Sequence, residues 1–170
     1  MLAKEAIIKK ADALAHRYKT RDPYELCSAL GIIIMERPFN KLKGAYKVIQ
    51  RNRFIFLRSE LDGDMKRIVL WHELGHDQLH RAEAADTDGF AEFDLFDMRK
   101  SRMEYEANVF AAQLAHSDEE VFELCRRGYD TEQIASALRS DINLIALKAD
   151  NLITKGYDLK PQEHKNDFLK

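Results

Sequence analysis

The stretch HELGH, residues 72–76, places two histidines four positions apart, with a glutamate directly after the first. It lies in a longer segment, residues 61–80, where apolar residues recur at helical spacing behind aspartates that can cap a helix. Residues four apart lie on one face of a helix, so His72 and His76 can direct their imidazoles at one ion. The stretch therefore predicts a metal-binding helix at the centre of the fold.

Glu73 favours a catalytic metal site over a purely structural one. Zinc accepts nitrogen and oxygen ligands in tetrahedral geometry and lowers the pKa of a bound water to about 7. Glu73 is rotated around the helix from the two histidines, so it can take a proton from that water without binding the ion. A structural site needs no base and usually has four protein ligands. We therefore expect His72 and His76 to bind one zinc ion, with Glu73 as the catalytic base.

Three residues are candidates for the third ligand. His80 continues the same helix face, but at ~1.5 Å per residue it lies ~12 Å from His72 on a straight helix. It is therefore expected to line the cleft, to contact substrate, or to follow a break in the helix. Glu104 has Asn108 four residues on, the pattern of a ligand with an orienting partner. Glu106 points to another face, so Glu104 is the preferred ligand and Glu106 the alternative.

The segments around the central helix predict a small α+β domain. Before residue 40, apolar spacing predicts two helices and a β-branched strand. Residues 45–50 and 53–58 form a predicted hairpin joined by Arg51–Asn52. No strand is evident later, so we expect an early three-stranded sheet packed on the 61–80 helix, followed by a helical C-terminal half. Gly75 is a poor helix residue, and its missing side chain predicts the close approach of another element.

The composition narrows the range of partners. A net charge of -2 disfavours attraction of the whole surface to nucleic acid or anionic lipid. No apolar run is long enough to span a membrane, and the first residues lack the core of a signal peptide. Cys27 and Cys125 lie in apolar-periodic segments and are predicted to be reduced, packed thiols. These features favour a cytoplasmic protein without a membrane partner.

Two blocks of sequence carry a family resemblance. HELGHDQLH at 72–80, followed by EYEANVFAAQL at 104–114, resembles the ImmA/IrrE family of zinc metallo-endopeptidases. The resemblance covers most of residues 5–115 and implies a zincin-like fold with one zinc ion. By this resemblance, His72, His76 and Glu104 would be the zinc ligands and Glu73 the catalytic base. Many members end the second block with Leu-Leu-Met-Pro, where this chain has residues 113–117, a segment that often shapes the cleft.

The resemblance also implies a biological role and a division of the chain. ImmA-like members of mobile elements or prophages cleave a helix-turn-helix repressor encoded alongside, so the expected function is that of an anti-repressor protease in transcription regulation. We expect a metallopeptidase domain over 1–116, a helical part over 117–160 packed on it, and a flexible tail over 161–170. The acidic segment 81–100 is expected to be either a flexible surface loop or a lid on the substrate side. Strand 53–58 is the candidate edge strand for an extended substrate, unless it is internal.

Two other functions compete with this one. Residues 131–148 contain two helices about a short turn, as in a DNA-binding motif. However, Arg139 stands where a turn glycine is usual, and Lys148 where an apolar residue should pack. Basic residues there are spread rather than striped, so direct nucleic-acid binding is disfavoured. The remaining alternative is a zinc-binding regulatory module that is non-catalytic or activated by a partner.

Overall fold

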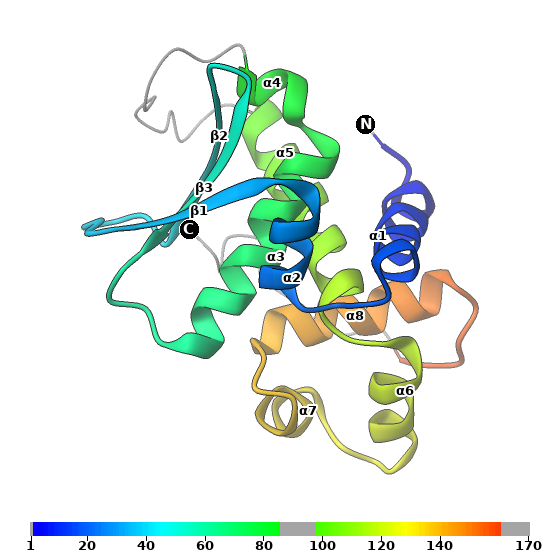
Figure 1. Cartoon of the computed structure of the whole chain (residues 1–170). Coiled ribbons are helices and arrows are strands. Elements are labelled where there is room, and N and C mark those ends of the chain that lie inside the picture. Colours follow the sequence, from blue (N-terminus) through cyan, green and yellow to red (C-terminus); the bar gives the residue numbers. More distant parts are fainter. Residues whose placement is uncertain (1, 86–97, 161–170) are drawn as a thin grey trace.

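The chain folds as helices around one small sheet (Figure 1). The computed structural model describes residues 2–85 and 98–160. In that part of the chain, the elements in order are α1 (Lys4–Tyr18), α2 (Pro23–Leu30), β1 (Ile32–Arg37), β2 (Gly44–Ile49), β3 (Asn52–Arg58), α3 (Gly63–Leu79), α4 (Arg81–Ala85), α5 (Met98–Ala115), α6 (Asp118–Arg126), α7 (Thr131–Ala137) and α8 (Ile142–Thr154).

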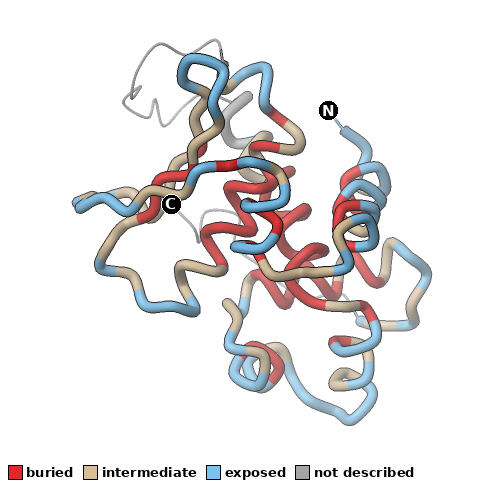
Figure 2. Tube along the Cα trace, viewed as in Figure 1, coloured by how far each residue is buried: buried red, intermediate tan, exposed pale blue. Residues whose placement is uncertain are grey.

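Helix α3, which carries the HELGH stretch, is the central element. It begins after Asp62, whose side chain accepts a hydrogen bond from the Met65 N–H. One side of α3 contacts the sheet and another contacts α5, which in turn contacts α1 and α8 (Figure 1). Figure 2 shows buried residues concentrated along α3 and α5. The predicted α+β fold, with an early sheet on this helix and a helical C-terminal half, is confirmed.

The order of the sheet is β1-β3-β2, with β1 parallel and β2 antiparallel to β3. The prediction that strand 53–58 forms a sheet edge is therefore wrong, because β3 is the central strand. Its continuous buried run, Ile55 to Leu57, is typical of a strand with neighbours on both sides. Among the described strands, β1 and β2 are the two at the edges of the sheet.

The turn between β2 and β3 lies one residue earlier than predicted. Ile49 pairs with Asn52, so Gln50 and Arg51 form the two-residue loop. Their φ angles are 49° and 67°, since such a tight hairpin turn requires left-handed backbone at both positions. Asn52 is the first residue of β3 rather than part of the turn.

Gly75 lets helix α5 approach α3 closely, as predicted. A Cβ atom built on Gly75 would lie 2.9 Å from both the Cα and the carbonyl oxygen of Ala107. Both are backbone atoms, so no side-chain rotation could relieve the contact. The two helices therefore meet backbone to backbone at this point, directly beside the two histidines.

The predicted loop over 81–100 is partly helical. Helix α4 occupies 81–85 and α5 begins at Met98. The remainder of that segment, where a lid was predicted, and the predicted flexible tail lie outside the described residues. Cys27 is buried and Cys125 half-buried, and both are free thiols, as predicted. None of the described helices has the length and apolar character needed to cross a membrane.

Helix α8 is a core element. Leu144 and Leu147 belong to the same buried cluster as residues of α1, α3 and α5, and within α8 only Ile142 is exposed. A recognition helix needs a face free to enter a groove, so this burial argues against DNA binding through α8. Arg139 takes the left-handed backbone, with a φ of 49°, that a glycine would favour in the turn before α8. The boundary at residue 116 stays a prediction.

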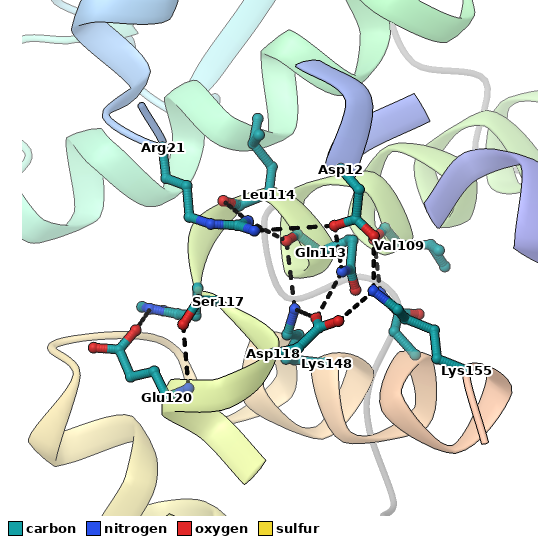
Figure 3. A network of polar contacts seen from close by, with 12 residues as sticks. Asp12, Arg21, Val109, Gln113, Leu114, Ser117, Asp118, Glu120, Lys148 and Lys155 are labelled. Atoms are coloured by element: carbon teal, nitrogen blue, oxygen red, sulfur yellow. Dashed lines mark hydrogen bonds and ion pairs between the residues drawn. The ribbon is translucent and has the colours of Figure 1, made fainter. Parts of the chain in front are cut away.

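A polar network explains why a lysine stands in the apolar part of α8 (Figure 3). The fully buried Lys148 donates to Asp118 Oδ1 at 2.6 Å, and Gln113 Nε2 donates to the same oxygen at 2.8 Å. Asp118 also pairs with Lys155, which joins α6 to α8. Gln113 therefore helps to join α5 to α6 and α8. Gln113 is nine residues from Glu104, ~13 Å along the helix. The expected role of segment 113–117 in shaping the cleft stays a prediction.

His116 beside this network should make folding sensitive to mild acid. Burial, together with the charges of Lys148, Arg21 and Arg67, lowers the pKa of His116 from 6.5 to about 4. The unfolded chain then binds a proton near pH 6.5 that the folded protein binds only near pH 4. Stability from this group is fully present above pH 6.5 and is lost as the pH falls towards 4, by at most about 3 kcal/mol.

The measurement is the free energy of unfolding from denaturant titrations between pH 4 and 7, for the wild type and His116→Leu. The Nε2 atom of His116 has no hydrogen-bond partner among the described residues, so the leucine leaves little unsatisfied. We expect the variant to have a flatter pH dependence over this window. Equal slopes for the two proteins would contradict the prediction.

Candidate metal centre

Three side chains from two helices converge beside the sheet. His72 Nε2 and His76 Nε2 from α3 lie 3.1 Å apart. The carboxylate of Glu104 from α5 lies 3.2 Å from the first nitrogen and 3.4 Å from the second. These three residues form a group whose potential ligand atoms lie within 4.8 Å of one another. The close approach at Gly75 brings α5 near enough for Glu104 to reach.

Hydrogen bonds on the far side of each ring determine which nitrogens carry protons. His72 Nδ1 lies 2.8 Å from Asn108 Oδ1, a carbonyl oxygen that only accepts, so Nδ1 carries the proton. His72 Nε2 then presents a lone pair to the other two atoms. His76 Nδ1 is likewise occupied, by His80 Nδ1 at 3.2 Å. Asn108 therefore lies where an orienting partner of a metal-binding imidazole is needed.

The three converging side chains fit a zinc ion. Electron pairs facing one another at these distances repel unless a cation lies between them. Ligand atoms of a tetrahedral site with bonds of about 2.0–2.1 Å are ~3.3 Å apart. The two nitrogens are separated by 3.1 Å, and each lies 3.2 Å or 3.4 Å from one of the two Glu104 carboxylate oxygens. Two imidazoles and one carboxylate with an open fourth position are also a donor set of catalytic zinc sites. The residues present thus match the metal that the sequence pattern predicts.

Electrostatics favour an ionised carboxylate at Glu104. Burial opposes ionisation there, but hydrogen bonds that His72 and His76 donate when their rings are protonated hold the pKa of the Glu104 carboxyl well below its usual range. Burial by itself would lower the pKa of His72. The pairing with Glu104 has the opposite effect and, together with the other neighbours of the ring, outweighs burial, so the pKa of His72 is raised above its usual value. A negative charge at the site is thus available to a cation.

Glu73 lies next to this group but outside it. Its side chain is only 6% exposed, and burial raises the pKa of its carboxyl above the usual value. The nearby histidines lower this pKa without reversing the shift, and the Tyr46 backbone N–H donates to the carboxylate. A raised pKa brings a carboxylate nearer to the range in which it can accept and return a proton at neutral pH.

The structure separates the two glutamates that the sequence left as alternatives. Glu104 faces His72 and His76, whereas Glu106 faces His80, with Oε2 at 3.0 Å from Nε2. Helix α3 ends at Leu79. The backbone angles of His80, φ −128° and ψ 26°, are not helical, so the predicted helix break occurs at this residue. His80 is 4% exposed, and its expected role at the cleft or in contact with substrate stays a prediction.

Several neighbouring residues were not singled out from the sequence. Tyr46 Oη donates to the buried Asp77 at 2.8 Å, and Arg53 pairs with Asp77 at 3.2 Å, which ties β2 and β3 to α3. A Cβ on Gly44 would collide with Val69 and lie 3.1 Å from Glu73 Oε1. In the sequence, only Asp77 could have indicated this group of contacts, because it is an acidic residue in a helix segment whose other residues are mostly buried. Its partners come from strands whose pairing order was not predicted.

Removal of the candidate third ligand, Glu104, should empty the site selectively. Glu104→Ala leaves two imidazoles and is expected to weaken zinc binding by at least about 100-fold, because two ligands rarely hold a structural or catalytic zinc. Metal content after dialysis and zinc affinity by chelator competition measure this. Glu106→Ala is the matched comparison on the same helix and should retain more zinc. The reverse ranking would show that Glu104 is not the ligand.

A small α+β fold whose central helix carries HExxH, with a glutamate supplied by the next long helix, defines the zincin-like class of metallopeptidases. The chain belongs to the IrrE N-terminal-like domain family of peptidases, which it matches over residues 27–149. The family resemblance drawn from the two sequence blocks is therefore confirmed.

Two relatives agree with this assignment. The chain is 40% identical over 116 residues to uncharacterized immunity region protein 2 of Bacillus phage phi105, covering 66% of this chain and 70% of that protein. It is 23% identical over 134 residues to metallopeptidase ImmA of Bacillus subtilis strain 168, covering 78% of this chain and 77% of ImmA. Membership in a metallopeptidase family implies a metal, and the group formed by His72, His76 and Glu104 is where it can bind.

Proposed function

We propose that this protein is a zinc-dependent endopeptidase that cleaves a helix-turn-helix repressor encoded alongside it, and so acts as an anti-repressor. The observation that carries the proposal is the triangle of His72 Nε2, His76 Nε2 and the Glu104 carboxylate, with Glu73 buried beside it. A zinc-binding module without activity would have no use for a buried carboxylate next to the ligand group.

In this proposal His72, His76 and Glu104 hold the ion, and Glu73 handles the proton. A bound zinc ion would supply Lewis acidity, which polarises the scissile carbonyl and acidifies the attacking water. Glu73 accepts the proton of that water at its carboxylate and later returns it to the leaving amine. The Tyr46 N–H holds the Glu73 carboxylate in place, and burial keeps its pKa high enough for it to accept and release this proton.

Strand β2 is the candidate partner of an extended substrate. Among the described strands it lies at an edge of the sheet, and it contacts α3. The lack of a side chain at Gly44 leaves its backbone close to Glu73. Backbone pairing along such an edge gives affinity with little demand on substrate sequence. This assignment replaces β3, which has a neighbour on each side.

The names of the two relatives favour a repressor as the substrate class. One relative is a metallopeptidase, and the other is a protein of a phage immunity region. A peptidase encoded in such a region would act on the protein that maintains immunity, which is a repressor. The proposed chemistry rests on the chain's own residues, and the proposed substrate class rests on the name of the phage relative.

The test combines purified protein with the helix-turn-helix repressor from the adjacent reading frame. Fragments are followed by mass spectrometry, with zinc content measured in parallel and a chelator-treated sample as the control. Zinc-dependent cleavage at a defined bond supports the proposal. An intact repressor despite full zinc occupancy would contradict it and favour the zinc-binding regulatory module.

A further inference from the structure

His80 and Glu106 form a buried chain of contacts that ends at His76. His76 Nδ1 lies 3.2 Å from His80 Nδ1, and His80 Nε2 lies 3.0 Å from Glu106 Oε2. His80 is 4% and Glu106 3% exposed. The other carboxylate oxygen of Glu106 accepts from the Leu2 backbone N–H at 3.2 Å and faces Arg102 at 3.6 Å.

The positions of the protons along this chain follow from donor and acceptor chemistry. A carboxylate only accepts, so the His80 ring nitrogen facing Glu106 must donate, which places a proton on Nε2. In the neutral ring His80 Nδ1 then has a lone pair and accepts. His76 Nδ1 must be the donor in that contact, and His76 Nε2 is left with its lone pair facing Glu104.

We propose that His80 and Glu106 are positioning residues for the metal centre. They hold His76 in the one tautomer and ring orientation that can bind metal through Nε2. This inference rests on the proposed zinc site. It extends that site by assigning a function to a histidine and a glutamate that are not ligands.

The two ligand histidines are then held in different ways. His72 is oriented by a neutral amide, Asn108, whereas His76 is oriented by an imidazole backed by a carboxylate. A carboxylate behind the chain strengthens the donated hydrogen bond and makes the bound imidazole more basic. The contribution of His80 as the helix C-cap comes from its backbone N–H, which bonds to the His76 carbonyl. The cap therefore does not involve the His80 side chain, which contacts His76 instead.

The experiment uses substitutions that differ in whether they keep an acceptor for His76. His80→Leu removes the acceptor, whereas His80→Asn places an amide oxygen near the position of Nδ1. Zinc affinity is measured by competition with a chromophoric chelator, and the tautomer of His76 by NMR of its imidazole nitrogens in zinc-loaded protein. We expect His80→Leu to lose about 10- to 100-fold in zinc affinity and His80→Asn to regain most of it. His16→Gln, an exposed histidine on α1, should match the wild type.

The outcomes distinguish this inference from the proposed function. If the wild type binds no zinc, the metal site itself is wrong, and the inference falls with it. If the wild type binds zinc but His80→Leu keeps full affinity and a single His76 tautomer, the positioning role is overturned and the metal site stands. Should His80→Leu fail to fold, Glu106→Gln replaces it, because the amide removes the charge and keeps the shape. Unchanged zinc affinity in that variant would overturn the inference as well.

Discussion

Glu73→Gln is expected to reduce peptide hydrolysis by about 10³-fold or more while zinc binding is unchanged, within the range by which general bases contribute to catalysis. Glu73 lies outside the group formed by the two histidines and Glu104, so its replacement removes no ligand. The glutamine keeps the shape of the side chain, and its carbonyl oxygen can still accept from the Tyr46 N–H. What is lost is the group that accepts the proton of the attacking water.

The measurement is kcat/KM for repressor cleavage, together with zinc stoichiometry and the melting temperature of both proteins. Glu83→Gln, an exposed glutamate on α4, serves as the matched control and should cleave like the wild type. Residual activity within a factor of about ten of the wild type would show that another residue accepts the proton. Loss of zinc from Glu73→Gln would instead place Glu73 among the ligands.

Gly75→Ala should destabilise the fold and weaken the metal site together. The added Cβ would lie 2.9 Å from backbone atoms of Ala107, so α3 and α5 must separate. Overpacking of this kind costs about 1–3 kcal/mol, which exceeds the ~1 kcal/mol that alanine gains over glycine in a helix. Ala107 is three residues from Glu104. A shift of α5 therefore also moves this candidate ligand away from the histidines, and zinc affinity should fall.

Gly63→Ala provides the matched control because Gly63 begins the same helix. A Cβ there meets nothing within 4 Å, so we expect no loss and a gain of up to about 1 kcal/mol. Free energies of unfolding from denaturant titrations, and zinc affinities by competition, are measured for both variants. A Gly75→Ala protein as stable as Gly63→Ala, with unchanged zinc affinity, would show that the two helices do not meet as closely as described.

The sequence alone determined the features that depend on neighbouring residues. The four-residue spacing of His72 and His76 places both on one helix face, whatever the rest of the fold does. A capping aspartate before the helix, with Asp62 and Asp64 as the candidates, and the role of Gly75 as a point of close approach were also predicted, because they follow from local backbone chemistry. The structure has Asp62 as the cap. Two sequence blocks, 72–80 and 104–114, were enough to recognise the family.

Only the tertiary structure decided which distant segments meet. Nothing local to strand 53–58 shows that it lies between two others, since strand order depends on pairing across the chain. The choice of Glu104 over Glu106 as the residue facing the histidines depends on how α5 packs against α3. The turn of His80 towards Glu106 and the pairing of Lys148 with Asp118 are likewise contacts between elements. Local spacing fixes which groups share a face, whereas packing between elements fixes which faces meet.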